Sequence, residues 1–188
     1  SFLDTKAKPF LHYRAIPAAP NSLSDSHINA LHAGRSGNIW IGTNSGGLNS
    51  FDRRTEQFRQ FLDSADDPIN LSTDNLTAVY EDSEGVVWVG TRGSGLIKYN
   101  PDTNQATQYT RESSNDHSIS HDSVVNIYED HVGTLWIGTY GGGINAFDRK
   151  SERFTRYLHD PSNPQSLSAN VVTSVIEDRS STIWVGTI

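Results

Sequence analysis

A repeat of 48 residues constrains this chain more than any other feature. Each unit contains a five-residue stretch in which tryptophan lies between two apolar residues and is followed by Gly-Thr, and the tryptophans are Trp40, Trp88, Trp136 and Trp184. Other columns keep the same register without gaps, among them Ser24, Ser72, Ser120 and Ser168, and Gly47, Gly95 and Gly143. Such regular spacing indicates a row of equivalent supersecondary units.

Each unit is expected to form four short strands. In the second unit, turn-forming residues separate four stretches rich in apolar or β-branched side chains: Thr77 to Glu81, Val86 to Thr91, Leu96 to Tyr99 and Ala106 to Tyr109. Polar residues before the segment from Val171 to Ile176 could cap a helix. The β-branched residues of this segment and its equivalents favour a strand instead.

Glycine marks the hairpin before each tryptophan strand. Gly37, Gly85 and Gly133 stand three residues before a tryptophan, where a tight turn requires positive φ. Ser181 replaces this glycine in the last unit, and we therefore expect a different turn there.

Four-stranded meanders that repeat every 40 to 50 residues are typical of a β-propeller, in which each sheet packs on its neighbours. The sequence thus predicts an all-β propeller of four-stranded antiparallel blades, with Trp88 and Trp136 buried between blades. The expected units are blades at 23–70, 71–118 and 119–166, the second half of a blade at 1–22, and the first half of a blade at 167–188.

Composition excludes several classes of partner. The chain has 22 acidic and 15 basic residues, a net charge of −7, and no basic run, so nucleic acid is not an expected partner. It has no cysteine and therefore neither disulfides nor thiolate metal sites. No apolar stretch reaches the roughly 18 residues of a membrane span, so this segment is not expected to insert directly into a membrane.

No motif predicts catalysis, a metal or a cofactor. The adjacent carboxylates at 81–82, 129–130 and 177–178 could in principle share protons or bind calcium. Because they recur at one place in successive blades, they are better interpreted as hairpin residues, in which Asp accepts hydrogen bonds from the turn backbone. The histidines show no metal-ligand spacing, and the glycine clusters lack the context of a phosphate loop.

Residues that differ between blades are the candidates for ligand binding, since identical columns serve the scaffold. Two sets of loops should share one face of a propeller, namely those after the Gly-Thr pairs and those that lead into each first strand. The candidates in the first set are Asn44, Arg92 and Tyr140, and in the second His27, Asn75 and Ser123. Side chains of these types can hold sugars or anionic groups.

The string from Val124 to Asp130, followed by Gly133 to Thr139 and Gly141 to Asp148, resembles the two-component regulator propeller repeat. That resemblance covers nearly all of the chain. It implies a periplasmic or otherwise extracytoplasmic sensor region of a membrane-bound receptor, whose output module is a histidine kinase or a diguanylate cyclase. It also implies a small-molecule ligand, for which a glycan fragment is one candidate.

Two alternative functions remain open from the sequence. The blades could be purely structural or mediate dimerisation while the ligand binds elsewhere, or the propeller could belong to a polysaccharide-active enzyme. The half-blades at the two ends are complementary. We therefore expect either two chains that close an eight-bladed ring, or the remaining blades of a longer receptor, to complete them.

Overall fold

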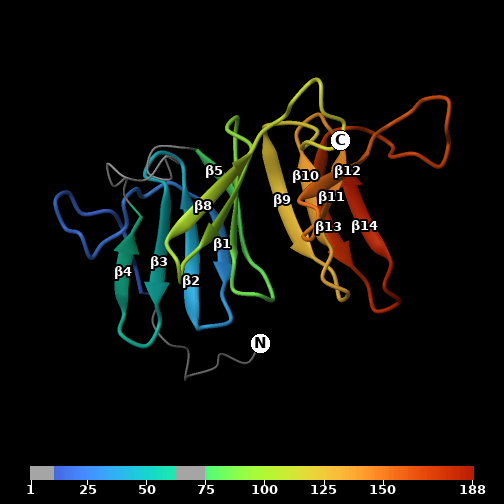
Figure 1. The fold of residues 1–188 in the computed structure, drawn as a ribbon. Coiled ribbons are helices and arrows are strands. Elements are labelled where there is room, and N and C mark those ends of the chain that lie inside the picture. The colour runs from blue at the N-terminus through green and yellow to red at the C-terminus, as the bar shows by residue number, and fades with distance from the viewer. Residues whose placement is uncertain (1–10, 62–74) are drawn as a thin grey trace, which may run out of the picture.

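The computed structural model describes residues 11–61 and 75–188, which form strands, turns and loops without helix. The expected all-β fold of four-stranded antiparallel sheets is confirmed. The sheets follow one another across the molecule, from blue and teal strands on one side to red strands on the other (Figure 1).

Each sheet is a meander of strands that are consecutive in sequence. The first blade contains β1 (Ile28–Ala33), β2 (Asn38–Thr43), β3 (Leu48–Asp52) and β4 (Gln57–Gln60). The second contains β5 (Leu76–Glu81), β6 (Val87–Thr91), β7 (Leu96–Asn100) and β8 (Gln105–Tyr109). The third contains β9 (Val124–Glu129), β10 (Leu135–Thr139), β11 (Ile144–Asp148) and β12 (Arg153–Tyr157). The half-blade contains β13 (Val172–Glu177) and β14 (Ile183–Thr187), and β13 is the strand that was favoured over a helix.

The core lies between consecutive blades. One apolar cluster joins Trp40 and Leu48 of the first blade to Leu76 and Val89 of the second. The next cluster joins Trp88 of the second blade to strands of the third in the same way. Both faces of the second blade are therefore covered, which explains why every residue of β6 is buried.

The inner strands pack closely because of the glycine in each Gly-Thr pair. A Cβ atom on Gly90 would lie 2.7 Å from Val124 Cγ1 of the following blade, and one on Gly138 would lie 2.6 Å from Val172 Cγ1. Real Cβ atoms do not approach other atoms so closely, so only glycine leaves room for the first apolar residue of the next inner strand.

The turn before the tryptophan strand has the same form in every unit. Gly37, Gly85 and Gly133 have φ of 89°, 79° and 87°. The expectation of a different turn at Ser181 was wrong, because Ser181 itself has φ of 63°. It donates its N–H to the Asp178 carbonyl at 3.0 Å, as Gly85 donates to Asp82 at 3.1 Å. The hydrogen bonds of the turn therefore outweigh the cost of positive φ in serine.

Tryptophan burial depends on the blade that follows. Trp40 is 4% exposed and Trp88 is fully buried, whereas Trp184, with no described blade after it, is 59% exposed. Trp136 was expected to be buried but is only partly so. The sheet described next to it contains β13 and β14, whereas Trp40 and Trp88 each face a four-stranded sheet.

Residues 1–22 were expected to form the second half of a blade. Residues 1–10 lie outside the described residues. Residues 11–22 form no strand, but an isolated bridge joins Ala15 to Leu23. Tyr13 packs against the first blade, with its ring centroid 5.0 Å from that of Phe51 and 5.3 Å from that of Phe58.

These burial differences predict the stability of tryptophan variants. Trp88→Ala should lower the free energy of unfolding by about 3 to 5 kcal/mol, since it removes a fully buried indole. Trp184→Ala should cost roughly 1 kcal/mol or less, because most of that side chain already contacts solvent. Chemical denaturation of the two variants measures both values. An equal loss in both would contradict the dependence of burial on the following blade.

Candidate ligand-binding face

The two predicted sets of loops meet at one end of the blades, which we call the loop face. In each blade the residue after Gly-Thr donates its backbone N–H to the residue that leads into the first strand. These bonds run from Asn44 to the His27 carbonyl at 2.9 Å, from Arg92 to the Asn75 carbonyl at 3.0 Å, and from Tyr140 to the Ser123 carbonyl at 2.9 Å. The backbone therefore holds the six candidate residues as three neighbouring pairs.

Two of the candidates connect blades. Asn75 donates its side-chain amide to Asn44 Oδ1 at 2.7 Å, and Asn29 donates to Asn75 Oδ1 at 3.2 Å. Asn29 also donates to the Leu76 carbonyl at 3.1 Å. This chain of amides joins the first blade to the second, so Asn44 and Asn75 have a structural role and are only partly available to a ligand.

Arg92 and Tyr140 differ from this pair, because their side chains point into solvent. Tyr140 is 60% exposed, and Arg92 is exposed on the loop of the adjacent blade. Neither side chain makes a hydrogen bond within residues 11–61 and 75–188. This face therefore displays a cation and an aromatic ring on the loops of adjacent blades, and their predicted use in ligand binding stays a prediction.

His121 belongs to the same face and was missed from the sequence. Its Nδ1 accepts the Ser123 N–H at 2.9 Å, which leaves Nε2 to carry the proton in the neutral ring. The ring faces Gly141, where a Cβ atom would lie 3.7 Å from Nε2. The sequence signal that could have found it is that the equivalent position of the first blade carries a different polar residue, Asp25.

Asp25 has the corresponding role beside Asn44. Its Oδ1 accepts the His27 N–H at 3.0 Å, while Oδ2 accepts the N–H of Ser45 at 3.0 Å and its hydroxyl at 2.8 Å. The bond from His27 N–H has the largest effect and lowers the pKa of Asp25 below its ordinary value. In both blades a side chain of this column fixes the loop that leads into the first strand.

At the opposite end, which we call the turn face, the recurrent aspartates act within their own hairpins. Asp82 Oδ1 accepts the N–H groups of Glu84 and Val86, each at 2.9 Å, and its Oδ2 accepts the Trp88 indole at 2.6 Å. Asp130 and Asp178 accept the indoles of Trp136 and Trp184 in the same manner. The prediction that these residues are hairpin residues is confirmed.

The glutamate before each aspartate connects two blades. Glu129 accepts the N–H of Ser83 at 2.7 Å and its hydroxyl at 2.6 Å, and Ser83 lies in the turn of the preceding blade. Glu177 accepts the His131 N–H at 2.8 Å and also contacts the His131 ring. The carboxylate pairs are therefore occupied by structural bonds, which supports neither a proton pair nor a calcium site.

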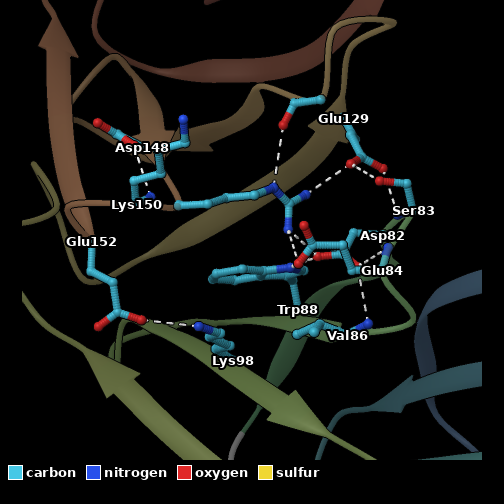
Figure 2. A network of polar contacts seen from close by, with 12 residues as sticks. Asp82, Ser83, Glu84, Val86, Trp88, Lys98, Glu129, Asp148, Lys150 and Glu152 are labelled. Carbon is cyan, nitrogen blue, oxygen red and sulfur yellow. Dashed lines mark hydrogen bonds and ion pairs between the residues drawn. The ribbon is translucent and has the colours of Figure 1, made fainter.

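Arg149 strengthens the joint between the second and third blades by bonding to Asp82 and Glu129, the two carboxylates labelled in Figure 2. Its guanidinium donates to Asp82 at 2.6 Å, to Glu129 at 2.8 Å and to the Gly133 carbonyl at 3.3 Å. Partial burial acts to lower the pKa of Arg149, but the bond to Asp82 and the surrounding carboxylates raise it overall. Asp82 is fully buried and Glu129 nearly so, so the single cation offsets part of the charge of two carboxylates that are largely removed from water.

Among residues 11–61 and 75–188, no group of three or more potential ligands could hold a metal ion. Within these same ranges, no helix is long and apolar enough to cross a membrane.

The repeated meanders, the inner strands packed on glycine and the indole–carboxylate turns define a β-propeller segment with one variable face. The chain belongs to the two component regulator propeller family, whose sequence profile matches residues 22–45, 70–93, 118–141 and 166–188. Each match covers the inner two strands of a unit together with the loop-face residues of that unit.

Solved structures support the fold. The extracellular domain of a putative one component system from B. thetaiotaomicron aligns with a TM-score of 0.71 and 24% identity over 92% of this chain and 22% of that one. The extracellular domain of a putative hybrid two component system from the same organism aligns with a TM-score of 0.71 and 23% identity, over 86% of this chain and 22% of that one. This chain therefore spans about a fifth of either structure.

A more distant neighbour is virginiamycin B lyase from Staphylococcus aureus, with a TM-score of 0.63 and 12% identity over 86% of this chain and 49% of that one. Similarity at this level shows a shared propeller fold and carries no information on activity. A comparison with curated proteins found no match.

The Arg149 contacts predict a large effect of one substitution. Arg149→Ala should lower the free energy of unfolding by about 3 kcal/mol, because it leaves the Asp82 and Glu129 carboxylates buried without their cation. Arg53→Ala, an exposed arginine in the β3–β4 turn, is the matched control and should change stability by less than about 0.5 kcal/mol. Urea denaturation compares the two variants, and similar small effects would show that solvent already screens the carboxylates.

The aspartates at the turns predict loss of stability in acid. Burial acts to raise the pKa of Asp130, but hydrogen bonds from the Trp136 indole and the Thr134 N–H outweigh it and keep the pKa below its ordinary 3.8. The Ser180 hydroxyl and the Trp184 indole likewise lower the pKa of Asp178. An aspartate whose pKa is lower in the folded state than in the unfolded state stabilises the fold at pH values above 3.8. This stabilisation disappears as the pH falls through the pKa of the folded state.

We therefore expect the free energy of unfolding to decrease as the pH falls below about 4, where the unfolded chain binds more protons than the folded one. Asp130→Asn should show a shallower dependence in this range. Denaturation curves measured from neutral pH to about pH 2 give the slope. A variant as acid-sensitive as the unmodified chain would assign the effect to other groups.

Proposed function

We propose that this segment is a non-catalytic, ligand-sensing part of an extracytoplasmic receptor and that its loop face contacts a small molecule, with glycan fragments as the first class to test. One observation carries the proposal. The backbone bond between the two loops is the same in three blades, whereas the side chains displayed there are Asn44 with His27, Arg92 with Asn75, and Tyr140 with Ser123. A constant support with varied side chains, of which Arg92 and Tyr140 point outward, suits recognition.

The chemistry of the exposed pair supports this ligand class. Tyr140 offers an aromatic face on which a sugar ring can pack, and Arg92 offers several donors for hydroxyl, carboxylate or sulfate oxygens. His121 adds a further donor at Nε2 beside Tyr140. An extracytoplasmic site is consistent with two of the solved neighbours, which are extracellular domains of a putative one component system and a putative hybrid two component system.

A non-catalytic role follows from how the acidic residues are used. The buried carboxylates that could act as acid and base are bonded to turn N–H groups, indoles and Arg149 on the turn face, away from the exposed pair. The loop-face carboxylates Asp25 and Asp122 likewise accept backbone N–H groups, Asp25 from His27 and Ser45 and Asp122 from Arg111.

A thermal-shift screen of glycans and metabolites tests this proposal. A molecule that binds only the folded chain raises its apparent melting temperature with concentration. Arg92→Ala and Tyr140→Ala should each reduce or abolish that increase while changing the melting temperature without ligand very little. Arg53→Ala, on the turn face, should keep it in full.

Two outcomes would favour the alternatives. A ligand whose effect survives both loop-face substitutions would bind elsewhere and leave these blades a structural role. Conversion of a polysaccharide by the chain, followed by chromatography of the products, would establish an enzyme.

A further inference from the structure

A groove lies between the first and second blades, toward the turn face. It is a cavity of about 460 Å³, and its lining includes Trp40, Ser50, Phe61 and Glu81. We propose that this groove binds a small guanidinium compound, with the Glu81 carboxylate as its anion. The groove is formed by two blades that each have all four strands, and it lies away from the loop face. This inference is therefore independent of the ligand proposed for that face.

The joint between the second and third blades shows which chemistry the equivalent place accepts. There the guanidinium of Arg149 donates to Asp82 at 2.6 Å and to Glu129 at 2.8 Å. The ammonium of Lys98 lies over the Trp88 ring, 5.9 Å from its centroid. Two cationic side chains of the chain itself thus occupy this part of the joint, beside an indole and two buried carboxylates (Figure 2).

Neither cation has an equivalent in the joint before it. One repeat earlier, position 149 corresponds to Pro101 and position 98 to Ser50, and both of these residues line the groove. Gly34 stands where the second blade has Asp82, so Glu81 is the carboxylate that remains of the buried pair. The first joint therefore keeps one anion and an indole but lacks the two side chains that accompany them in the next joint.

Glu81 has capacity for a further donor. It is 7% exposed, and its Oε2 accepts the Trp40 indole at 2.5 Å while its Oε1 accepts the Arg35 N–H at 3.1 Å. The equivalent Glu129 accepts two donors from Ser83 and still receives a guanidinium, on the same Oε1 atom that accepts the Ser83 hydroxyl. Within residues 11–61 and 75–188, no lysine or arginine forms an ion pair with Glu81. A carboxylate so far removed from water gains more from a cation than an exposed one does.

The rest of the lining suits a planar cation. The ring centroids of Trp40 and Phe61 lie 5.5 Å apart, and a guanidinium packs favourably on aromatic rings. Asp52 and Asp102 add two carboxylates to the lining, against the single cation of Arg59. The groove therefore carries an excess of negative charge.

Arg59 is the cation that could compete from within the chain. Its guanidinium lies over the Phe61 ring, 4.6 Å from the centroid, and leaves Glu81 without a counter-ion. The charge of Arg59 also repels a second cation in the same groove. We therefore expect Arg59→Ala to bind an added guanidinium compound about twofold more tightly than the unmodified chain does.

The Trp40 indole N–H is a local reporter of this site, because it donates to Glu81. The 188-residue chain is titrated with butylguanidine at constant chloride concentration and followed by proton–nitrogen correlation spectra. We expect a saturable shift of the Trp40 indole signal and no shift of the Trp88 signal, since Arg149 already occupies that joint. Butylamine should bind about tenfold more weakly, because an ammonium lacks the planar fork that matches a carboxylate.

Two pairs of variants assign the binding to the groove. Glu81→Gln keeps the size of the side chain and an acceptor for the indole, and should weaken binding by about tenfold or more. Glu112→Gln, an exposed carboxylate after β8, makes the same change of charge and should leave binding unchanged. Pro101→Arg introduces the residue that the third blade has at this position, and should abolish binding and raise the melting temperature. Pro101→Ala should do neither.

Three results would overturn the proposal. They are no saturable shift of the Trp40 signal up to about 10 mM butylguanidine, unchanged binding by Glu81→Gln, and binding that occurs only in Arg59→Ala. The last result would show that Arg59 itself serves as the counter-ion of Glu81. If Glu81→Gln does not fold, Pro101→Arg decides, and binding that persists in that variant overturns the proposal.

Discussion

The close approach of each inner strand to the glycine of the blade before it determines much of this structure. Because Val124 and Val172 occupy the space that a side chain on Gly90 or Gly138 would need, successive sheets approach closely enough to form continuous apolar clusters. The indoles of Trp40 and Trp88 then lie buried between two four-stranded sheets. Burial of the tryptophan is therefore a property of a pair of blades and cannot be assigned to one repeat alone.

The two ends of each blade have different roles, because one end holds neighbouring blades together and the other displays variable side chains. On the turn face, carboxylates, indoles and Arg149 are bonded to one another across the joints, so substitutions there affect stability first. On the loop face the joint is held by backbone bonds, a few amides and the Thr77 hydroxyl, which donates to the Val124 carbonyl. Side chains such as Arg92 and Tyr140 are consequently free to vary from blade to blade without disturbing the packing.

Much of the fold could be predicted from the sequence because a fixed period shows both the strands and the turns. The strands of the second blade begin and end within one residue of their predicted bounds, and the glycines have the expected positive φ. The exposure of Trp136 and the turn at Ser181 could not be predicted in the same way. The first depends on which strands follow, and the second on hydrogen bonds that stabilise a backbone conformation that serine disfavours.

The loop-face residues could be chosen from their positions in the repeat, but the sequence could not show which of them bond to another blade and which face solvent. Nothing in the sequence distinguishes Asn75, whose amide bonds to Asn44, from Arg92, which points into solvent. Similarly, the Glu-Asp pairs were recognisable as structural, yet only the coordinates show that the aspartate serves its own turn while the glutamate serves the preceding blade.

The first blade shows how the two carboxylates can exchange roles. It has Gly34 where the other blades have an aspartate, so the Trp40 indole has no acceptor in its own turn. Glu81 of the second blade accepts that indole at 2.5 Å and the Arg35 N–H at 3.1 Å. A Cβ atom on Gly34 would clash with the Glu81 carboxylate, so an aspartate could not be restored there without displacing it. Because position 34 carries no carboxylate, Glu81 can accept both the Trp40 indole and the Arg35 N–H. A buried indole therefore finds its acceptor either in its own turn, as Trp88 does in Asp82, or in the next blade, as Trp40 does in Glu81.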